Sequence, residues 1–284
     1  MEGGLDTLTI GQCATLACLL EVTANKPGNV YPGADFQELT LNDFLVSAVS
    51  IGPAMQHAAG RPIGLTVLAA VRATRTVVQT NTNLGTLLLL APLAKVGLSQ
   101  PLRAGVGEVL DSLAETDASE IYEAIRLASP GGMGRVDEMD VTGPSPPSLL
   151  DAMRAAAERD LVARQYVNRF EQVFDASGAW LVEAQEAGWT LRESIVRTHV
   201  RLMATFPDSL IARKCGQQLA DESACRAAEV LSRGVPGDAN YEKGLGELDG
   251  WLRADGNRRN PGTTADLITA GLFVALRNEM LDLS

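Results

Sequence analysis

Polar side chains that could do chemistry gather near the N-terminus, directly after an apolar segment. Glu21 is followed by Lys26 and Asn29, and Asp35 comes a few positions later. Lys26 precedes a Pro-Gly pair, and because proline disfavours the helical conformation in the residue before it, a helix is expected to end here. Polar groups this dense beside an apolar helix end indicate a site with catalytic carboxylates, although the same residues could simply solvate the helix end.

A second polar cluster precedes a strongly apolar segment. It contains Asn81, Thr82, Asn83 and Gly85, and leucines dominate the residues that follow. Asn and Thr are favourable N-cap residues, so the cluster is expected at the positive, N-terminal end of a buried helix. Such an end suits an anion, phosphate above all, but plain capping of a core helix would use the same residues.

Three carboxylates follow a glycine-rich segment in the middle of the chain. Asp137, Glu138 and Asp140 come directly after the glycines of residues 131–134. Mg²⁺ prefers oxygen ligands, so these carboxylates could hold the ion over a polyphosphate. An exposed acidic loop would have the same composition.

Two further carboxylates stand beside helical patterns in the C-terminal half. Asp208 is placed near the start of one, which also carries Lys214, and Asp266 precedes the last apolar segment. The common phosphate-loop, dinucleotide, zinc-protease and hydrolase motifs are missing. The two histidines, His57 and His199, are expected to be structural, so acid–base work must fall mainly to Asp and Glu.

The segments that position these residues have helical spacing. Aromatic residues are only 5% of the chain, Ala and Leu dominate, and no two-residue alternation bounded by turns occurs. We therefore expect an all-α fold of about ten to twelve helices whose polar loops converge on one site. The expected helices cover residues 8–23, 41–59, 63–78, 87–94, 117–128, 149–174, 176–187, 191–205, 208–216, 220–232, 241–254 and 267–280.

Length and charge narrow the class of protein. The 284 residues can bury a sizeable core, and no linker or repeat divides them, so one domain over residues 1–284 is expected. A net charge of −11 argues against nucleic acid or an anionic membrane as partner. No apolar run is long enough to cross a bilayer, and the acidic N-terminus lacks the features of a signal peptide, which indicates a cytoplasmic protein. Its many apolar helices could also support a homodimer.

The order of the polar clusters resembles the triphosphoribosyl-dephospho-CoA synthase family. The resemblance covers residues 10 to 280, and its first and last motifs are the most specific. The motifs are Glu21-Val-Thr-Ala-Asn-Lys-Pro-Gly28, Phe44-Leu-Val-Ser-Ala48, Asn81-Thr-Asn-Leu-Gly85, the glycines of 131–134, Asp208-Ser-Leu-Ile211 and Asn260-Pro-Gly-Thr-Thr-Ala-Asp-Leu267.

The resemblance implies a helical enzyme that joins ATP to 3′-dephospho-CoA. A 2′-hydroxyl of the acceptor attacks ribose C1 of ATP, adenine leaves and the triphosphate stays on the product. The resemblance implies that the site contains Glu21, Lys26, Asn29, Asn81, Thr82, Asp208 and Asp266. A carboxylate can stabilise the oxocarbenium character at C1, and the hydroxyl needs a proton acceptor. Glu21 or Asp208 could serve either role. Lys26, Lys214 and the Asn81-Thr82-Asn83 helix end are expected to hold the phosphates, with Asn29, Gly85 and Asp266 as further substrate-binding residues. Mg²⁺ held by carboxylates, Glu21, Asp137 and Glu138 among them, would help to hold the phosphates.

The chain departs from the family pattern in the second cluster. Asn83 and Leu84 stand where the family has histidine and lysine. Ribosyl transfer with other substrates therefore stays open, such as phosphoribosyl transfer during assembly of tetrahydromethanopterin. A helical nucleotide-binding protein without turnover is a third hypothesis, but retained carboxylates at Glu21, Asp208 and Asp266 argue against it.

Overall fold

The computed structural model describes residues 7–131 and 139–283, and these are helical throughout apart from their connections. The expected all-α class is confirmed, with an isolated bridge between Tyr31 and Ala34 as the β feature of the described residues. The helices are α1 (Ile10–Thr23), α2 (Leu41–Gln56), α3 (Ile63–Arg75), α4 (Leu84–Lys95), α5 (Leu102–Asp111), α6 (Glu115–Ala128), α7 (Leu149–Ala156), α8 (Leu161–Val167), α9 (Ala179–Glu186), α10 (Leu191–Thr205), α11 (Ser209–Cys215), α12 (Gln217–Ser232), α13 (Ala239–Arg253) and α14 (Gly262–Arg277). A 3₁₀ turn (Ala58–Gly60) and a π-helix (Gln172–Gly178) complete them.

Local sequence signals begin several of these helices. The Thr9 side chain accepts a hydrogen bond from the Gln12 backbone, and the Gln12 side chain accepts one from Thr9 in return. Thr40 with Asp43 and Thr190 with Glu193 form the same capping box at α2 and α10. Each box satisfies backbone N–H groups that the first helical turn would otherwise leave without partners.

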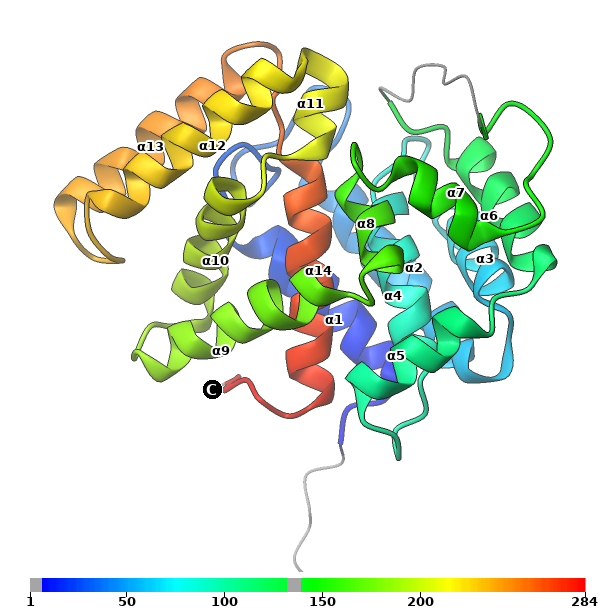
Figure 1. Ribbon diagram of the computed structural model, residues 1–284. Coiled ribbons are helices and arrows are strands. Elements are labelled where there is room, and N and C mark those ends of the chain that lie inside the picture. The colour runs from blue at the N-terminus through cyan, green and yellow to red at the C-terminus, as the bar shows by residue number, and fades with distance from the viewer. Residues whose placement is uncertain (1–6, 132–138, 284) are drawn as a thin grey trace, which may run out of the picture.

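The centre of the fold is made of helices that are apolar on nearly every side. In α4 the residues from Leu87 to Ala94 are all buried, and α14 is buried from Leu267 to Leu276. Helix α14 packs against α1, α4 and the π-helix, and the remaining helices surround this group (Figure 1). Polar residues at the ends of α1, α4 and α14 are thereby held on rigid elements.

A second, smaller apolar cluster joins the helices that follow α9. It includes Val200 of α10, Ile211 of α11, Ala227 of α12 and Leu252 of α13. Helices α12 and α13 lie side by side at one edge of the molecule, next to α10 and α11 (Figure 1).

The described residues form fourteen α-helices, slightly more than the ten to twelve expected. The expected single helix over residues 149–174 is wrong, because Asp160 caps a new helix by accepting from the backbone of Val162 and Ala163. Arg169 and Phe170 then take positive φ angles of 58° and 64°, which ends α8 before the π-helix.

Helix α5 was not expected, because glycines at 105 and 107 weaken its helical pattern. No helix of the described residues is long and apolar enough to span a membrane.

Candidate active site

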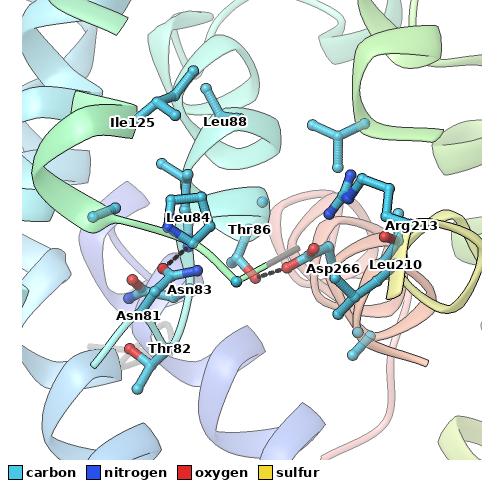
Figure 2. A pocket seen from close by; sticks show the side chains of 18 of the residues that line it. Asn81, Thr82, Asn83, Leu84, Thr86, Leu88, Ile125, Leu210, Arg213 and Asp266 are labelled. Atoms are coloured by element: carbon cyan, nitrogen blue, oxygen red, sulfur yellow. Dashed lines mark hydrogen bonds between the residues drawn. The ribbon is translucent and has the colours of Figure 1, made fainter. Parts of the chain in front are cut away.

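One large cavity collects most of the polar residues singled out in the sequence. Its volume is about 1210 Å³, and its wall is formed by the end of α1, the start of α4, helices α6 to α8, α11 and the start of α14. Sites for one small molecule usually measure about 300–1,000 Å³, so this cavity has room for more than one substrate. Figure 2 shows Asn81, Thr82 and Asn83 on one side of it and Arg213 on another.

Glu21 lies on this wall in the last turn of α1 and is held there by Lys26. Lys26 Nζ lies 3.0 Å from Glu21 Oε1 and also donates to the backbone carbonyls of Glu21 and Ala24. Burial lowers the pKa of Lys26, while the charge and hydrogen bond of Glu21 oppose that shift. Gly28 permits the tight turn behind this pair, with φ of +77° and the side chains of Leu252 and Pro261 against it.

The expected phosphate-binding role of Lys26 is not supported by its position. Its side chain is fully buried and is not part of the described cavity wall. All three ammonium hydrogens have a partner, the Glu21 carboxylate and two carbonyls, so none is left for a substrate. The geometry instead makes Lys26 a positioning residue for Glu21.

The second polar cluster lies where the sequence predicted it, at the start of α4 on the cavity wall. Asn81 Oδ1 accepts from the backbone of Leu84 at 3.1 Å, and the Thr82 hydroxyl lies 2.8 Å from that of Ser47. Asn83 Nδ2 donates to the Thr74 hydroxyl at 3.4 Å. These bonds fix the turn that leads into the helix.

Asp266, in the second turn of α14, contacts the first turn of α4 at the cavity wall. Thr86 Oγ1 donates to Asp266 Oδ1 at 2.7 Å, as drawn in Figure 2. A Cβ on Gly85 would lie far inside van der Waals contact with Asp266 Oδ2, so only glycine allows this approach. Burial raises the pKa of Asp266 to about 7, against the Thr86 hydrogen bond and with help from Glu21, Asp208 and Asp160.

Asp208 joins two helix starts and is not on the described cavity wall. Its Oδ1 accepts from the backbone of Leu210 and Ile211 at 2.8 and 3.0 Å. Its Oδ2 accepts from the backbone and hydroxyl of Thr264 at 2.7 and 2.8 Å. Asp208 is 0% exposed, and each of its oxygens accepts two hydrogen bonds. It therefore fits a structural cap better than the expected proton acceptor.

Cations line the side of the cavity formed by α11 and the loop before α14. Lys214 Nζ donates to Asn260 Oδ1 at 3.0 Å, and Arg258 donates to the Lys214 carbonyl at 2.8 Å. Burial lowers the pKa of Lys214. Arg213 pairs with Asp160, and both line the cavity. Lys214 thus lies on the cavity wall, and its expected phosphate-binding role stays a prediction.

Several residues of the cavity wall have no recognisable signal in the sequence. Arg213, Arg258, Asp160 and Thr86 follow no recognisable spacing, because they meet only after α4, α8, α11 and α14 pack. Asn260 belongs to the last motif of the family resemblance, which is the one signal that points to it.

Of the other residues expected at the site, one lies on the cavity wall, one lies off it and two are outside the described residues. Asn29 is buried on the cavity wall, and its Oδ1 has no hydrogen-bond partner among the described residues. Asp35 is exposed, caps α2 by accepting from the backbone of Leu41 at 2.6 Å, and lies off the described wall, so its expected catalytic role is not supported. Asp137 and Glu138 lie outside the described residues.

A metal site made of protein ligands alone does not occur in the described part of the chain, where no three His, Cys, Asp or Glu side chains come together. Mg²⁺ bound to a polyphosphate usually needs only one or two protein carboxylates. Asp140 lines the cavity, and its Oδ1 accepts from the backbone and hydroxyl of Thr142. Glu21 is paired with Lys26, and its expected role as a metal ligand stays a prediction.

A helical fold around a large cavity with both carboxylates and cations on its wall fits an enzyme that acts on phosphorylated small molecules. The chain belongs to the ATP:dephospho-CoA triphosphoribosyl transferase family, whose model matches residues 7–283. It is similar to the crystal structure of an Archaeoglobus fulgidus protein provisionally named a triphosphoribosyl-dephospho-CoA synthase. The identity is 27% and the TM-score 0.64, over 84% of this chain and 100% of that one. No curated protein matches the chain.

Proposed function

We propose that the chain transfers the triphosphoribosyl group of ATP to 3′-dephospho-CoA and releases adenine. Membership of the triphosphoribosyl transferase family supports this activity. The observation that carries it is the large cavity of about 1210 Å³ whose wall bears both carboxylates and cations. Such a cavity can hold a donor and an acceptor together, as a direct transfer between two nucleotides requires.

The chemistry breaks the bond between ribose C1 and adenine and forms a bond between C1 and the acceptor hydroxyl oxygen. The ribose gains oxocarbenium character in the transition state, which a nearby carboxylate stabilises. Glu21 is oriented by Lys26 and lines the cavity, so it is placed to stabilise this charge and to accept the hydroxyl proton.

The triphosphate is proposed to bind along the cationic side of the cavity. The donors available there are Lys214, Arg213, Arg258 and Arg159. Arginine suits phosphate because its planar group donates two parallel hydrogen bonds, whereas lysine acts as a point charge. Asn81, Thr82 and Asn83 add neutral polar groups on another part of the wall. This arrangement supplies positive charge even though Leu84 replaces the lysine of the family pattern.

Mg²⁺ is expected to accompany the triphosphate, where it would neutralise phosphate charge. Asp140, a carboxylate that lines the cavity, supports this expectation, because one or two carboxylates are enough to hold Mg²⁺ on a polyphosphate. ATP and dephospho-CoA are small intracellular molecules, so the activity is consistent with a cytoplasmic location. A homodimer stays a prediction that gel filtration with light scattering can check.

The experiment that tests this function follows adenine release by chromatography. Wild-type protein with ATP and Mg²⁺ is expected to release adenine only when dephospho-CoA is added. Glu21→Gln is expected to abolish release, while Glu38→Gln, an exposed carboxylate at the rim, serves as the matched control. Adenine release with phosphoribosyl acceptors other than dephospho-CoA, and none with dephospho-CoA, would replace the proposed acceptor.

A further inference from the structure

Two carboxylates of the cavity have opposite electrostatic surroundings. Glu21 on α1 is paired with the buried ammonium of Lys26 at 3.0 Å. Asp266 on α14 forms no ion pair within the described part of the chain, and its hydrogen-bond partner is the neutral hydroxyl of Thr86. Both carboxylates raise the pKa of the Cys18 thiol, after burial itself, so they act on the same small region of the wall. Two carboxyl groups in such different surroundings are typical of a general acid and a general base in one active site.

We propose that Asp266 is the general acid that protonates adenine as it leaves ATP, while Glu21 accepts the proton of the attacking hydroxyl. The proposal rests on the proposed triphosphoribosyl transfer and adds a catalytic role to a residue that the sequence assigned only to substrate binding. Asp266 is well suited because it lines the cavity, lacks a cationic partner and is held in one orientation by Thr86 and the Gly85 backbone.

The step balances in atoms and protons. The C1–N bond to adenine breaks and its electron pair goes to the base, which takes a proton from the Asp266 carboxyl. The C1–O bond forms and the hydroxyl proton passes to Glu21. After the products leave, Asp266 regains a proton and Glu21 loses one by exchange with water in the cavity, so the enzyme returns to its starting state.

The surroundings of Asp266 favour the protonated carboxyl before the step, and they also stabilise the carboxylate that is left after it. Burial, then the carboxylates of Glu21 (α1), Asp208 (the cap of α11) and Asp160 (the cap of α8), raise its pKa, whereas the Thr86 hydroxyl on α4 lowers it, with a result of about 7. The first turn of α4 lies directly against the same carboxylate. The positive end of the helix dipole at this turn stabilises the anion that remains once the proton is given away.

The test compares two donors. Asp266→Asn keeps an acceptor for Thr86 but has no proton to give, so its kcat with ATP is expected to fall about 100-fold or more, within the usual range for removal of a general acid. With ATP methylated at N7, whose base already carries positive charge and needs no proton, the variant is expected to stay near the wild-type rate. Equal losses with both donors, or no loss with ATP, would overturn the proposal. If the wild-type protein released neither adenine from ATP nor the methylated base from the methylated donor, the proposed function itself would be refuted.

The pH profile gives an independent readout. Because the protonated carboxyl is the active form, wild-type kcat with ATP is expected to fall as pH rises through about 7. Thr86→Val removes the hydrogen bond that lowers the pKa, so the fall should move to higher pH, whereas Asp266→Asn should lose it. An identical alkaline fall in all three proteins would contradict the assignment.

A stability measurement covers the case in which the variants are poorly active. The pKa of Asp266 is raised by folding, so the native protein loses stability relative to Asp266→Asn as pH rises from 4 to 7. The Tm of the wild type minus the Tm of Asp266→Asn should therefore fall by several degrees between pH 4 and pH 7. A constant difference would mean that Asp266 is ionised throughout and cannot be the acid.

Discussion

The ion pair between Lys26 and Glu21 is the most unusual feature at the scale of single residues. A lysine with 0% exposure is rare, and burial of its charge is costly unless a partner and further hydrogen bonds compensate. Here the Glu21 carboxylate and two carbonyls do so. The lysine therefore holds the Glu21 side chain at the cavity wall, and we expect it to affect the reaction through Glu21.

Lys26→Met is predicted to lower kcat and leave the binding of ATP unchanged. Removing one partner of a buried pair costs about 3–5 kcal/mol, so the Tm should fall as well. Lys214→Met is the matched variant, since Lys214 lines the cavity and its loss should raise the Kd for ATP. Isothermal titration calorimetry separates the two effects. A Kd for ATP that rises equally in both variants would show that Lys26 contacts the phosphates.

The residue types of the site could be read from the sequence more reliably than their roles. Residues of the turn after Glu21, the polar start of α4 and the last motif with Asp266 all line the cavity. The roles of Lys26 and Asp208 could not be assigned, because they depend on which side chains are buried once α1, α11 and α14 pack. Burial of a charged group leaves no local sequence signal.

Helix starts meet at the site at the scale of elements. The first turn of α4 contacts the second turn of α14 through Thr86 and Asp266, and Asp208 ties the start of α14 to that of α11. Asp208 thus does two things, since it caps α11 and binds the first turn of α14.

Asp208→Ala is predicted to destabilise the fold by about 2–4 kcal/mol, because it removes the caps of two helices at once. Ser148→Ala, which removes one exposed cap at α7, should cost about 1 kcal/mol. Urea unfolding monitored by circular dichroism gives both values. An Asp208→Ala protein with wild-type stability and no turnover would return Asp208 to the list of catalytic residues.

Gly85→Ala is predicted to reduce turnover with the helices intact. The new Cβ would collide with the Asp266 carboxylate and push it away from Thr86. Gly97→Ala is the control, because nothing lies within 4 Å of the position its Cβ would take. Steady-state kinetics on both variants decides the matter: equal kcat values would mean that the contact between α4 and Asp266 has no part in the reaction.

The positions of most helices followed from spacing and capping residues, but the segment over residues 149–174 did not. Its apolar periodicity continues across two breaks that depend on tertiary structure. One is the cap made by Asp160, which also pairs with Arg213 of α11, and the other is the left-handed pair Arg169 and Phe170. Contacts with distant residues outweigh local helical preference at both places.

The charge of the whole molecule is distributed unevenly. A net charge of −11 would repel a triphosphate from most of the surface. The cavity wall nevertheless carries as many cations as carboxylates among its described residues; the cations are Arg75, Arg159, Arg213, Lys214 and Arg258. The cavity is therefore the part of the molecule that best accommodates polyanionic substrates. Overall composition could not predict this, because it averages over the cavity and the rest of the surface.

The central claim is that this cavity joins two nucleotides without losing the triphosphate. Mass spectrometry of the product formed by wild-type protein from ATP, Mg²⁺ and dephospho-CoA tests it most directly. The account predicts a species that contains dephospho-CoA plus the complete triphosphoribosyl group, with one adenine released for each molecule formed. Unchanged dephospho-CoA alongside free triphosphoribose and adenine would show hydrolysis instead, and would contradict the transfer.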